Sequence, residues 1–402
     1  MQAELLRKRI LGGIMRRFKL NASVIVFAHS DMRATRDPVV PDSLPTTKRP
    51  LLRAAVEAEL RRGLDELAGV AADPTGASVA EEARGAFTSL TPSLADAPPQ
   101  RIKTAVLARI LARAPTLPRP EALKLVWMAL TRYQYLGLRS TMSAATPPDI
   151  YLKFERFDAL EGFASLFNCA LPRYYGLFPD LEAPFGCVGN FFGIEPTAAP
   201  RLLLCNPPYM AQVMNAFVNK ALELLDGSQC TVVCVLPAFE TADRAALNEG
   251  AKCKERYPVD YTTDVDTALL KASAHNRWCG LYCKERFRFV EPAREELAAL
   301  TSVLVLVLSS MPKPSPSIQE IEASFPTRDL PCTPGTRAAA IYTSIGTKSY
   351  SVRSASSAEL PHSSTNRSTA ASTASATASA STAAASASNK SRRATGGRGR
   401  GG

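Results

Sequence analysis

Apolar positions recur at helical spacing in the first third of the chain. In LLRAAVEAELRRGLDELAGVA, which begins at residue 51, they fall at 52, 56, 60, 64 and 67, a spacing that predicts one face of a helix. RIKTAVLARILARA (101–114) and EALKLVWMALTRYQYLGL (121–138) predict two further helices, separated by prolines at 115, 118 and 120. We therefore predict that residues 50–140 are all-helical.

Beyond Pro148 the pattern changes to short apolar runs between glycines and prolines. LLLC (202–205) and TVVCVL (231–236) have the length of buried strands, and the segment between them carries apolar residues at helical spacing. Because parallel strands need a helical crossover, these segments predict a βαβ unit. TSVLVLVLSS (301–310) is a further candidate strand. The predicted fold class is α/β, with a Rossmann-like sheet after an N-terminal helical subdomain.

The two ends of the chain differ from its middle. The first twenty residues are arginine-rich and amphipathic, and we favour a basic helix at a domain edge over a mitochondrial transit peptide because serine is absent there. Beyond residue 350 the chain consists of Ser/Thr/Ala repeats and ends in NKSRRATGGRGRGG, a composition that predicts disorder. The predicted domains are a basic segment and linker (1–49), a helical subdomain (50–147), an α/β domain (148–312), a linker (313–350) and a disordered tail (351–402).

Charge narrows the classes of partner. The chain has 48 basic and 37 acidic residues, a net charge of +11, which favours a polyanionic partner and nucleic acid first. From residue 351 onward, seven basic residues and one acidic residue give +6. An arginine/glycine end of this kind contacts RNA through charge and guanidinium stacking, although it could also be a solubilising tail.

The cysteines and the hydropathy exclude other classes. Nine cysteines, several within apolar runs and none in a paired CxxC knuckle, indicate buried thiols in a reducing compartment and predict no metal site. No apolar run reaches the roughly 18 residues of a membrane span, so we expect no membrane partner.

A polar corner follows the first strand of the predicted βαβ unit. It consists of Asn206, Pro207, Pro208 and Tyr209. Ligands of doubly wound sheets bind outside the carboxyl ends of the strands, and the two prolines restrict the backbone there. The Asn206 amide oxygen and the Pro207 carbonyl can then accept from one planar NH2 group while Tyr209 stacks on its ring.

Such paired acceptors pull the amino hydrogens out of plane and aim the nitrogen lone pair at an electrophile. The natural electrophile is the methyl group of S-adenosylmethionine. An ordinary rigid turn between a strand and a helix is the structural alternative.

The tetrapeptide resembles the Asn-Pro-Pro-Tyr/Phe signature of amino methyltransferases that act on adenine, cytosine or glutamine amide nitrogen. Residues 154–214 resemble the catalytic core of the phosphorylated-CTD-interacting-factor family, cap-specific adenosine N6-methyltransferases, and the resemblance extends over roughly residues 50 to 310. The shared elements are Phe163-Ala164-Ser165, Phe167-Asn168-Cys169, Phe178-Pro179-Asp180, Phe185-Gly186, Gly189, Asn206-Pro207-Pro208-Tyr209 and Val213-Met214.

This resemblance implies a class I methyltransferase sheet, S-adenosylmethionine as methyl donor, and N6 of the cap-adjacent adenosine of mRNA as acceptor. It also implies a nuclear location, with the cytoplasm as an alternative. Catalysis is expected at Asn206 to Tyr209, and substrate contacts at Tyr209 and Phe239, although Phe239 could equally be a core residue. The implied cofactor residues are Asn168, Asp180, Gly186, Gly189 and Asn206.

Physical roles can be assigned to three of these cofactor residues. Gly186 and Gly189 would let the backbone approach the methionine closely. Asp180 could accept hydrogen bonds from a ribose hydroxyl or from the amino group, or could simply cap a turn.

The chain also departs from the family pattern. Ala211 stands where the family has a glutamate near the substrate, and no WW module with two spaced tryptophans precedes the helical region, so docking to the polymerase tail is not implied. Two alternatives stay open: an N6-adenine or amide methyltransferase with another substrate, and a catalytically weakened RNA-binding relative. His275, in HNRWCGLYCKERF, has no counterpart and could be structural or functional.

Overall fold

The computed structural model describes residues 1–18, 20, 40, 50–70, 77–136, 145–238, 247, 267–291, 296–298 and 301–331. The chain divides into two compact units, Met1–Thr347 and Lys348–Gly402, and all described residues belong to the first. Its helices are α1 (Gln2–Phe18), α3 (Pro50–Ala68), α4 (Thr104–Ala112), α5 (Arg119–Tyr135), α6 (Pro148–Tyr151), α7 (Pro179–Glu182), α8 (Ala211–Gly227), α10 (Thr267–Ala272) and α11 (Ile318–Glu322). Short 3₁₀ helices are η2 (Leu152–Phe157), η3 (Ala183–Phe185), η4 (Phe191–Gly193) and η5 (Pro196–Ala198).

The strands form one large sheet and two small ones. Their bounds are β1 (Val79–Arg84), β2 (Phe87–Pro92), β3 (Gln100–Lys103), β4 (Leu160–Ala164), β5 (Tyr174–Gly176), β6 (Cys187–Gly189), β7 (Leu202–Cys205), β8 (Thr231–Pro237), β9 (Asn276–Tyr282), β10 (Phe289–Glu291), β11 (Glu296–Ala298), β12 (Val303–Ser309) and β13 (Leu330–Pro331). The small sheets are β1-β2-β3 and the hairpin β10-β11.

Eight strands form the central sheet, in the order β6-β5-β4-β7-β8-β12-β9-β13. The strands from β6 to β8 are parallel, whereas β12 is antiparallel to both of its neighbours. Numbered along the chain, the first seven of these are the third, second, first, fourth, fifth, seventh and sixth strands of the sheet. The order reverses between β4 and β7, and a doubly wound sheet binds its ligand outside the carboxyl ends at such a reversal.

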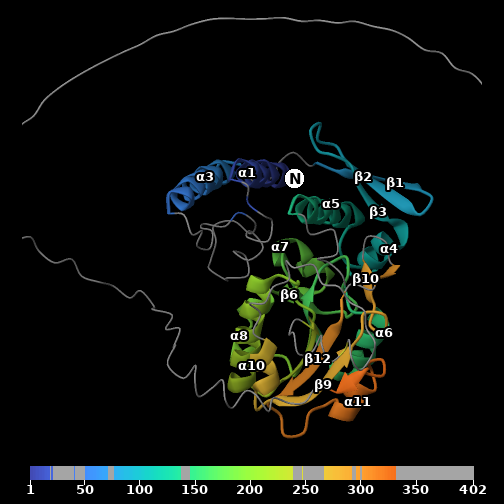
Figure 1. Ribbon diagram of the computed structural model, residues 1–402. Helices are drawn as coiled ribbons and strands as arrows, with labels where there is room; N and C mark the ends of the chain where they lie inside the picture. Colours follow the sequence, from blue (N-terminus) through green and yellow to red (C-terminus); the bar gives the residue numbers. More distant parts are fainter. Residues whose placement is uncertain are drawn as a thin grey trace, which may run out of the picture. The chain divides into compact units, whose positions relative to one another are not determined.

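Helices cover both faces of this sheet (Figure 1). The even-numbered residues of β12 from 304 to 308 pack with α8 and α10, and its odd-numbered residues from 303 to 307 pack with α6, η2 and α11. Because successive side chains of a strand point to opposite faces, a strand buried on both sides must be apolar throughout. This explains why β7, β8 and β12 are continuous apolar runs.

The predicted βαβ unit is confirmed. β7 and β8 pair in parallel from Leu202↔Thr231 to Cys205↔Cys234, and α8 connects them. The further candidate strand at 301–310 is β12. The α/β class is therefore confirmed, and the order of the parallel strands is Rossmann-like.

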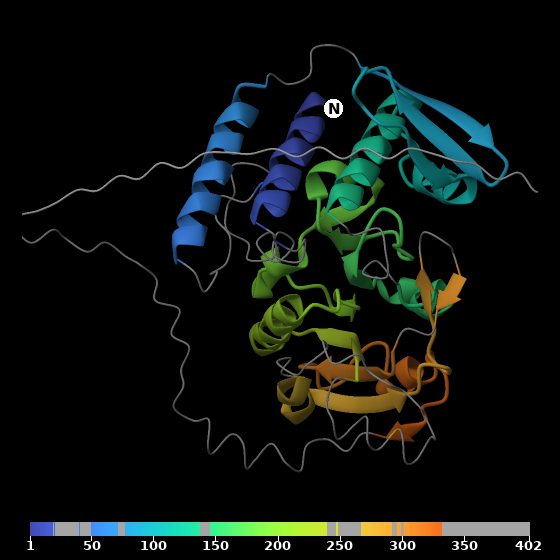
Figure 2. The ribbon, with the colours of Figure 1, turned by 45° about the horizontal axis from the view of Figure 1, so that its top comes forward.

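The prediction that residues 50–140 are all-helical is wrong. The three expected helices are α3, α4 and α5, but the sequence between α3 and α4 forms an antiparallel sheet of β1, β2 and β3 (Figure 2). Gly85, with a φ of 60°, opens the two-residue turn between β1 and β2, as a type II′ hairpin turn requires. Of the six residues of β1 only Val79 is buried, so the strand lacks the apolar alternation that would have predicted it.

The arginine-rich start of the chain forms α1, which packs against α3 and α5. Its buried apolar side chains are Leu6, Leu11 and Ile14. None of the described helices has the length and apolar character of a membrane span.

Part of the predicted linker at 313–350 folds onto the sheet. A capping box opens α11, since Ser317 Oγ accepts from the Glu320 backbone N–H and the Glu320 carboxylate accepts from the Ser317 backbone N–H. Ile321 and Phe325 are buried, and β13 pairs with β9. The linker prediction is therefore wrong for residues 318–331. The predicted disordered tail, 351–402, lies outside the described residues.

Candidate active site

Four of the predicted site segments follow neighbouring strands of the sheet. Asn168 and Asp180 come shortly after β4 and β5, Gly189 ends β6, and Asn206 directly follows β7. These four strands are adjacent and parallel, so their carboxyl ends share one edge of the sheet. The structure thus brings residues separated by up to 38 positions in the sequence to a single edge.

The corner at Asn206–Tyr209 lies where the strand order reverses, between the ends of β7 and β4. Its backbone is fixed on both sides: β7 is fully buried, and the Met210 N–H donates to the Pro208 carbonyl at 2.7 Å before α8 begins. Pro207 is buried, whereas Asn206, Pro208 and Tyr209 are partly exposed. The corner is therefore rigid and also reachable.

Tyr209 orients the Asn206 side chain. Its hydroxyl donates to Asn206 Oδ1 at 3.1 Å, and its ring makes an edge contact with Phe289, with centroids 5.9 Å apart. Burial raises the pKa of the Tyr209 phenol well above its ordinary value, so the hydroxyl keeps its proton. An amide oxygen has two lone pairs and can accept more than one hydrogen bond.

Asn168 shapes the turn after β4. Its Oδ1 accepts from the Ser165 backbone N–H at 2.7 Å and from Ser165 Oγ at 2.9 Å. The turn Ser165–Cys169 is therefore held from within. The structure assigns Asn168 this local role at the edge, and its cofactor contact stays a prediction.

Asp180 lies in the first turn of α7 and is held by a residue that the sequence did not single out. Both of its carboxylate oxygens accept from Nη1 of Arg132 in α5, at 2.7 and 2.9 Å. About a third of the Asp180 side chain is exposed (32%), whereas Arg132 is fully buried. Arg132 also binds Glu4 of α1, at 2.9 Å. Sequence periodicity gives no signal for such a link, because the partners lie in three separate helices.

The two predicted glycines differ in their surroundings. Gly186 precedes β6 at a φ of 102°, and a Cβ there would lie 2.1 Å from the Pro172 carbonyl oxygen. This close contact is enough to require glycine at position 186, so no ligand is needed to explain it. Gly186 also lies at the amino end of β6, away from the edge that carries Asn206. Gly189 ends β6 at a φ of 147°, on the edge that carries Asn206, and a Cβ there would meet only the Tyr175 ring, at 3.9 Å.

The sequence prediction also missed two buried carboxyl groups that lie behind this edge of the sheet. Glu161 of β4 accepts from the backbone N–H groups of Ala170 and Leu171, both at 2.6 Å, and burial raises its pKa to about 7. Glu182 of α7 accepts from Tyr133 and Tyr174 and from the Leu166 backbone N–H, and burial likewise raises its pKa to about 7. Both hold the loop after β4 from below, so their roles are structural.

The remaining predicted residues lie elsewhere or outside the description. Phe239 lies outside the described residues, and Ala211 is the first residue of α8, with its side chain not described. His275 precedes β9 at the opposite edge of the sheet, where its Nε2 pairs with Asp226 at 2.8 Å. His275 is thus hydrogen-bonded to a surface carboxylate away from the candidate site.

Six of the seven cysteines in the described part of the chain are buried thiols, as predicted. Cys279 is disulfide-bonded and departs from the prediction of buried thiols in a reducing compartment. The free and buried ones are Cys169, Cys187, Cys205, Cys230, Cys234 and Cys283. Among the described residues, no three His, Cys, Asp or Glu side chains gather in a way that could hold a metal ion.

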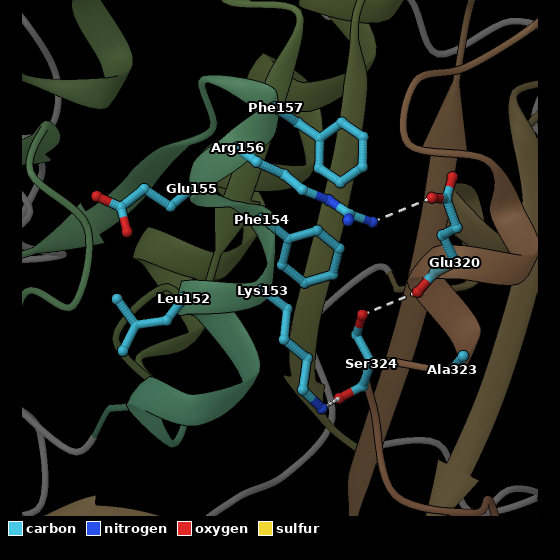
Figure 3. Close-up of a pocket in the computed structure, with 9 residues that line it drawn as sticks. All are labelled: Leu152, Lys153, Phe154, Glu155, Arg156, Phe157, Glu320, Ala323 and Ser324. Atoms are coloured by element: carbon cyan, nitrogen blue, oxygen red, sulfur yellow. Dashed lines mark hydrogen bonds and ion pairs between the residues drawn. The ribbon is translucent and has the colours of Figure 1, made fainter.

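A groove of about 720 Å³ lies between η2 and α11 (Figure 3). Arg156 pairs with Glu320 across it at 3.2 Å, and Lys153 donates to the Ser324 carbonyl. Since η2 precedes β4 and α11 follows the antiparallel β12, the groove lies toward the amino ends of the parallel strands. It is therefore separate from the corner.

Residues 119–256 match the family model described as Phosphorylated CTD interacting factor 1 WW domain. The matched segment is about a third of the chain and contains α5, the strands β4 to β8 and the corner Asn206–Tyr209. The match supports a relation to this family over that region. Its one tryptophan, Trp127, is buried in α5, and the absence of a WW module stays a prediction.

Proposed function

We propose that this protein transfers a methyl group from S-adenosylmethionine to N6 of adenosine in RNA, at the cap-adjacent first transcribed nucleotide of mRNA. The observation that carries the proposal is the place of Asn206–Tyr209, directly after β7 at the reversal of strand order. The family match of residues 119–256 supports it. So does the order of the five parallel strands, which is that of a doubly wound, nucleotide-binding sheet.

The residues at this edge fit an adenosyl ligand. In a doubly wound sheet, an acidic residue after the second strand accepts hydrogen bonds from the ribose of a bound nucleotide. Asp180 follows the second strand and keeps about a third of its side chain exposed (32%). Gly189 ends the third strand, and its missing Cβ, which would only touch the Tyr175 ring at 3.9 Å, leaves the backbone open to close approach.

The corner would bind and activate the acceptor. The Asn206 amide oxygen and the Pro207 carbonyl would accept the two hydrogens of N6, and the ring of the partly exposed Tyr209 would stack on the purine. Holding these hydrogens out of the ring plane turns the nitrogen lone pair toward the donor. This is positioning and electrostatics, and it needs no general base at the corner.

When bound, S-adenosylmethionine supplies an electrophilic methyl group whose carbon–sulfur bond breaks as the carbon–nitrogen bond forms, with the electron pair remaining on sulfur. N6 then carries an extra proton, which the Asn206 and Pro207 oxygens hold by hydrogen bonds until it is lost to water. The Tyr209 hydroxyl keeps its proton, because its pKa is raised, and donates a hydrogen bond to Asn206, so it does not remove the proton from N6.

The RNA partner is proposed from charge. The net charge of +11 and the basic end of the chain favour a polyanion. A methyltransferase for another adenine or amide would keep the same corner, so only the acceptor separates it from the cap-specific enzyme. An RNA-binding relative of low activity is the further alternative, and Ala211 favours it.

Labelled S-adenosylmethionine and three acceptors test the proposal: capped RNA beginning with adenosine, the same RNA uncapped, and capped RNA beginning with guanosine. Methyl transfer to the first acceptor alone supports the cap-specific function. Transfer to all three supports the broader methyltransferase, and binding of RNA without cofactor binding or transfer supports the inactive relative.

Asn206→Ala connects the activity to the corner. Removing one preorganised group at a reacting centre costs about 10²- to 10³-fold in kcat. Asn219→Ala, an exposed position on α8, is the matched control and should retain the parent rate. Normal turnover by Asn206→Ala would show that the corner does not carry the reaction.

A further inference from the structure

A buried chain of charges connects the first helix to the candidate cofactor edge. Arg132 is fully buried in α5 and binds two carboxylates, Glu4 of α1 and Asp180 of α7. Its Nε and Nη2 donate to Glu4 at 3.2 and 2.9 Å, while its Nη1 donates to Asp180 at 2.7 and 2.9 Å. Its guanidinium also lies over the Phe178 ring, 4.8 Å from the centroid.

The inner end of this chain is fixed from several sides. Glu4 is fully buried, and Tyr135 donates its hydroxyl to Glu4 Oε1 at 2.7 Å. Arg7, one turn further along α1, donates to Glu4 Oε2 at 3.2 Å. Burial alone would lower the pKa of Arg132, but attraction to Glu4 and Asp180 outweighs it and raises that pKa. Arg132 therefore remains a cation in a rigid setting.

At the outer end of this chain of charges, the Asp180 carboxylate is partly exposed. Two carboxylates follow β5, and Glu182 is fully buried by Tyr133, Tyr174 and the Leu166 backbone. Asp180 uses its oxygens on a single Arg132 nitrogen and remains about a third exposed (32%). A carboxylate has about four acceptor sites, so Asp180 can accept further hydrogen bonds.

We propose that Glu4 and Arg132 are positioning residues that hold the Asp180 carboxylate for the ribose hydroxyls of the adenosyl cofactor. This inference rests on the proposed function. It makes the N-terminal helix part of the cofactor site, although Glu4 lies 176 residues from Asp180 in the sequence. Arginine suits this task because its planar fork presents fixed donors to two carboxylates at once, which lysine does not.

Glu4→Gln is the direct test. The amide keeps the volume but replaces one acceptor oxygen with a donor that faces the Arg132 donors, so the guanidinium must shift away. Asp180 moves with it. We expect the dissociation constant of S-adenosylhomocysteine to rise about 5- to 30-fold, while kcat at saturating cofactor changes by less than about two-fold.

A ligand comparison isolates the ribose contact. Calorimetry with S-adenosylhomocysteine and with its 2′-deoxyribose counterpart measures how much the hydroxyl contributes in each variant. The parent should prefer the hydroxylated ligand by about five-fold or more, and Glu4→Gln and Asp180→Asn should both lose this preference. Glu81→Gln is the control: it removes the carboxylate of β1 that pairs with the exposed Arg119, and this variant should keep the preference for the hydroxylated ligand.

The outcomes separate the two proposals. An unchanged ligand preference in folded Glu4→Gln overturns the positioning role. Should Glu4→Gln melt below the assay temperature, Tyr135→Phe removes one hydrogen bond to Glu4 without changing charge, and the preference must weaken there as well. A parent protein that binds neither ligand overturns the proposed function itself.

Discussion

Tyr209→Phe tests how the corner holds its amide. The substitution removes the hydroxyl that donates to Asn206 Oδ1 at 3.1 Å and leaves the ring and its edge contact with Phe289. Tyr209→Ala removes the hydroxyl, the ring and the contact with Phe289. The pair of variants therefore separates orientation of the amide from stacking on the substrate.

The expected losses follow from these contacts. A neutral hydrogen bond contributes about 0.5–1.5 kcal/mol, so Tyr209→Phe should lower kcat/KM about two- to twelve-fold. Stacking on a base adds about 1–3 kcal/mol and the edge contact with Phe289 about 0.5–1.5 kcal/mol. Tyr209→Ala should then lower kcat/KM by at least about 30-fold.

Single-turnover methyl transfer with labelled donor and capped RNA measures both variants. Tyr282→Phe is the matched control, because the Tyr282 hydroxyl is buried with no hydrogen-bond partner in the described part of the chain. It should keep the parent rate. Equal losses in Tyr209→Phe and Tyr209→Ala would refute the stacking role, and a parent rate in Tyr209→Ala would refute both.

Three further predictions concern stability and RNA binding. Folding raises the pKa of the Glu161 carboxyl from 4.5 to about 7, so its contribution to stability is present below pH 4.5 and is lost as the pH rises through 7. In urea titrations of Glu161→Gln, the fall in unfolding free energy between these pH values should be smaller by up to roughly 3 kcal/mol. An unchanged dependence of the unfolding free energy on pH would contradict this. Gly186→Ala forces a Cβ to within 2.1 Å of the Pro172 carbonyl oxygen at a φ of 102° and should lower the melting temperature by several degrees, whereas Gly13→Ala, with open space, should not. Truncation after residue 350 removes a net charge of +6 and should weaken RNA binding and flatten its salt dependence in anisotropy titrations without changing cofactor affinity; an unchanged salt slope would show that the tail makes no phosphate contacts.

The strands of the sheet centre could be predicted from the sequence because they are buried on both faces. Continuous apolar runs gave β7, β8 and β12, and the helical spacing between two of them gave α8. β5 and β6 have three residues each and are too short for any periodicity to mark them. β1 is exposed along most of its length, so its hairpin could be predicted only from Gly85.

The candidate site was predictable only where its chemistry is local. The tetrapeptide Asn206–Tyr209 is contiguous, and its place after a strand follows from the neighbouring apolar run. The link from Asp180 through Arg132 to Glu4 spans three helices, and periodicity carries no information about partners 48 or 128 residues away. Gly186 is an example of the opposite error. The sequence led us to assign this glycine to the cofactor, but its close approach to Pro172, which only the fold reveals, explains it.

The most direct test of the central claim is identification of the product nucleoside. Purified protein is incubated with S-adenosylmethionine and a capped RNA beginning with adenosine, and the RNA is digested and analysed by mass spectrometry. The account predicts a methyl group on N6 of the first nucleotide, lost in Asn206→Ala and retained in Asn219→Ala. Unmodified adenosine in the presence of bound cofactor, or a methyl group on any other atom, would contradict it.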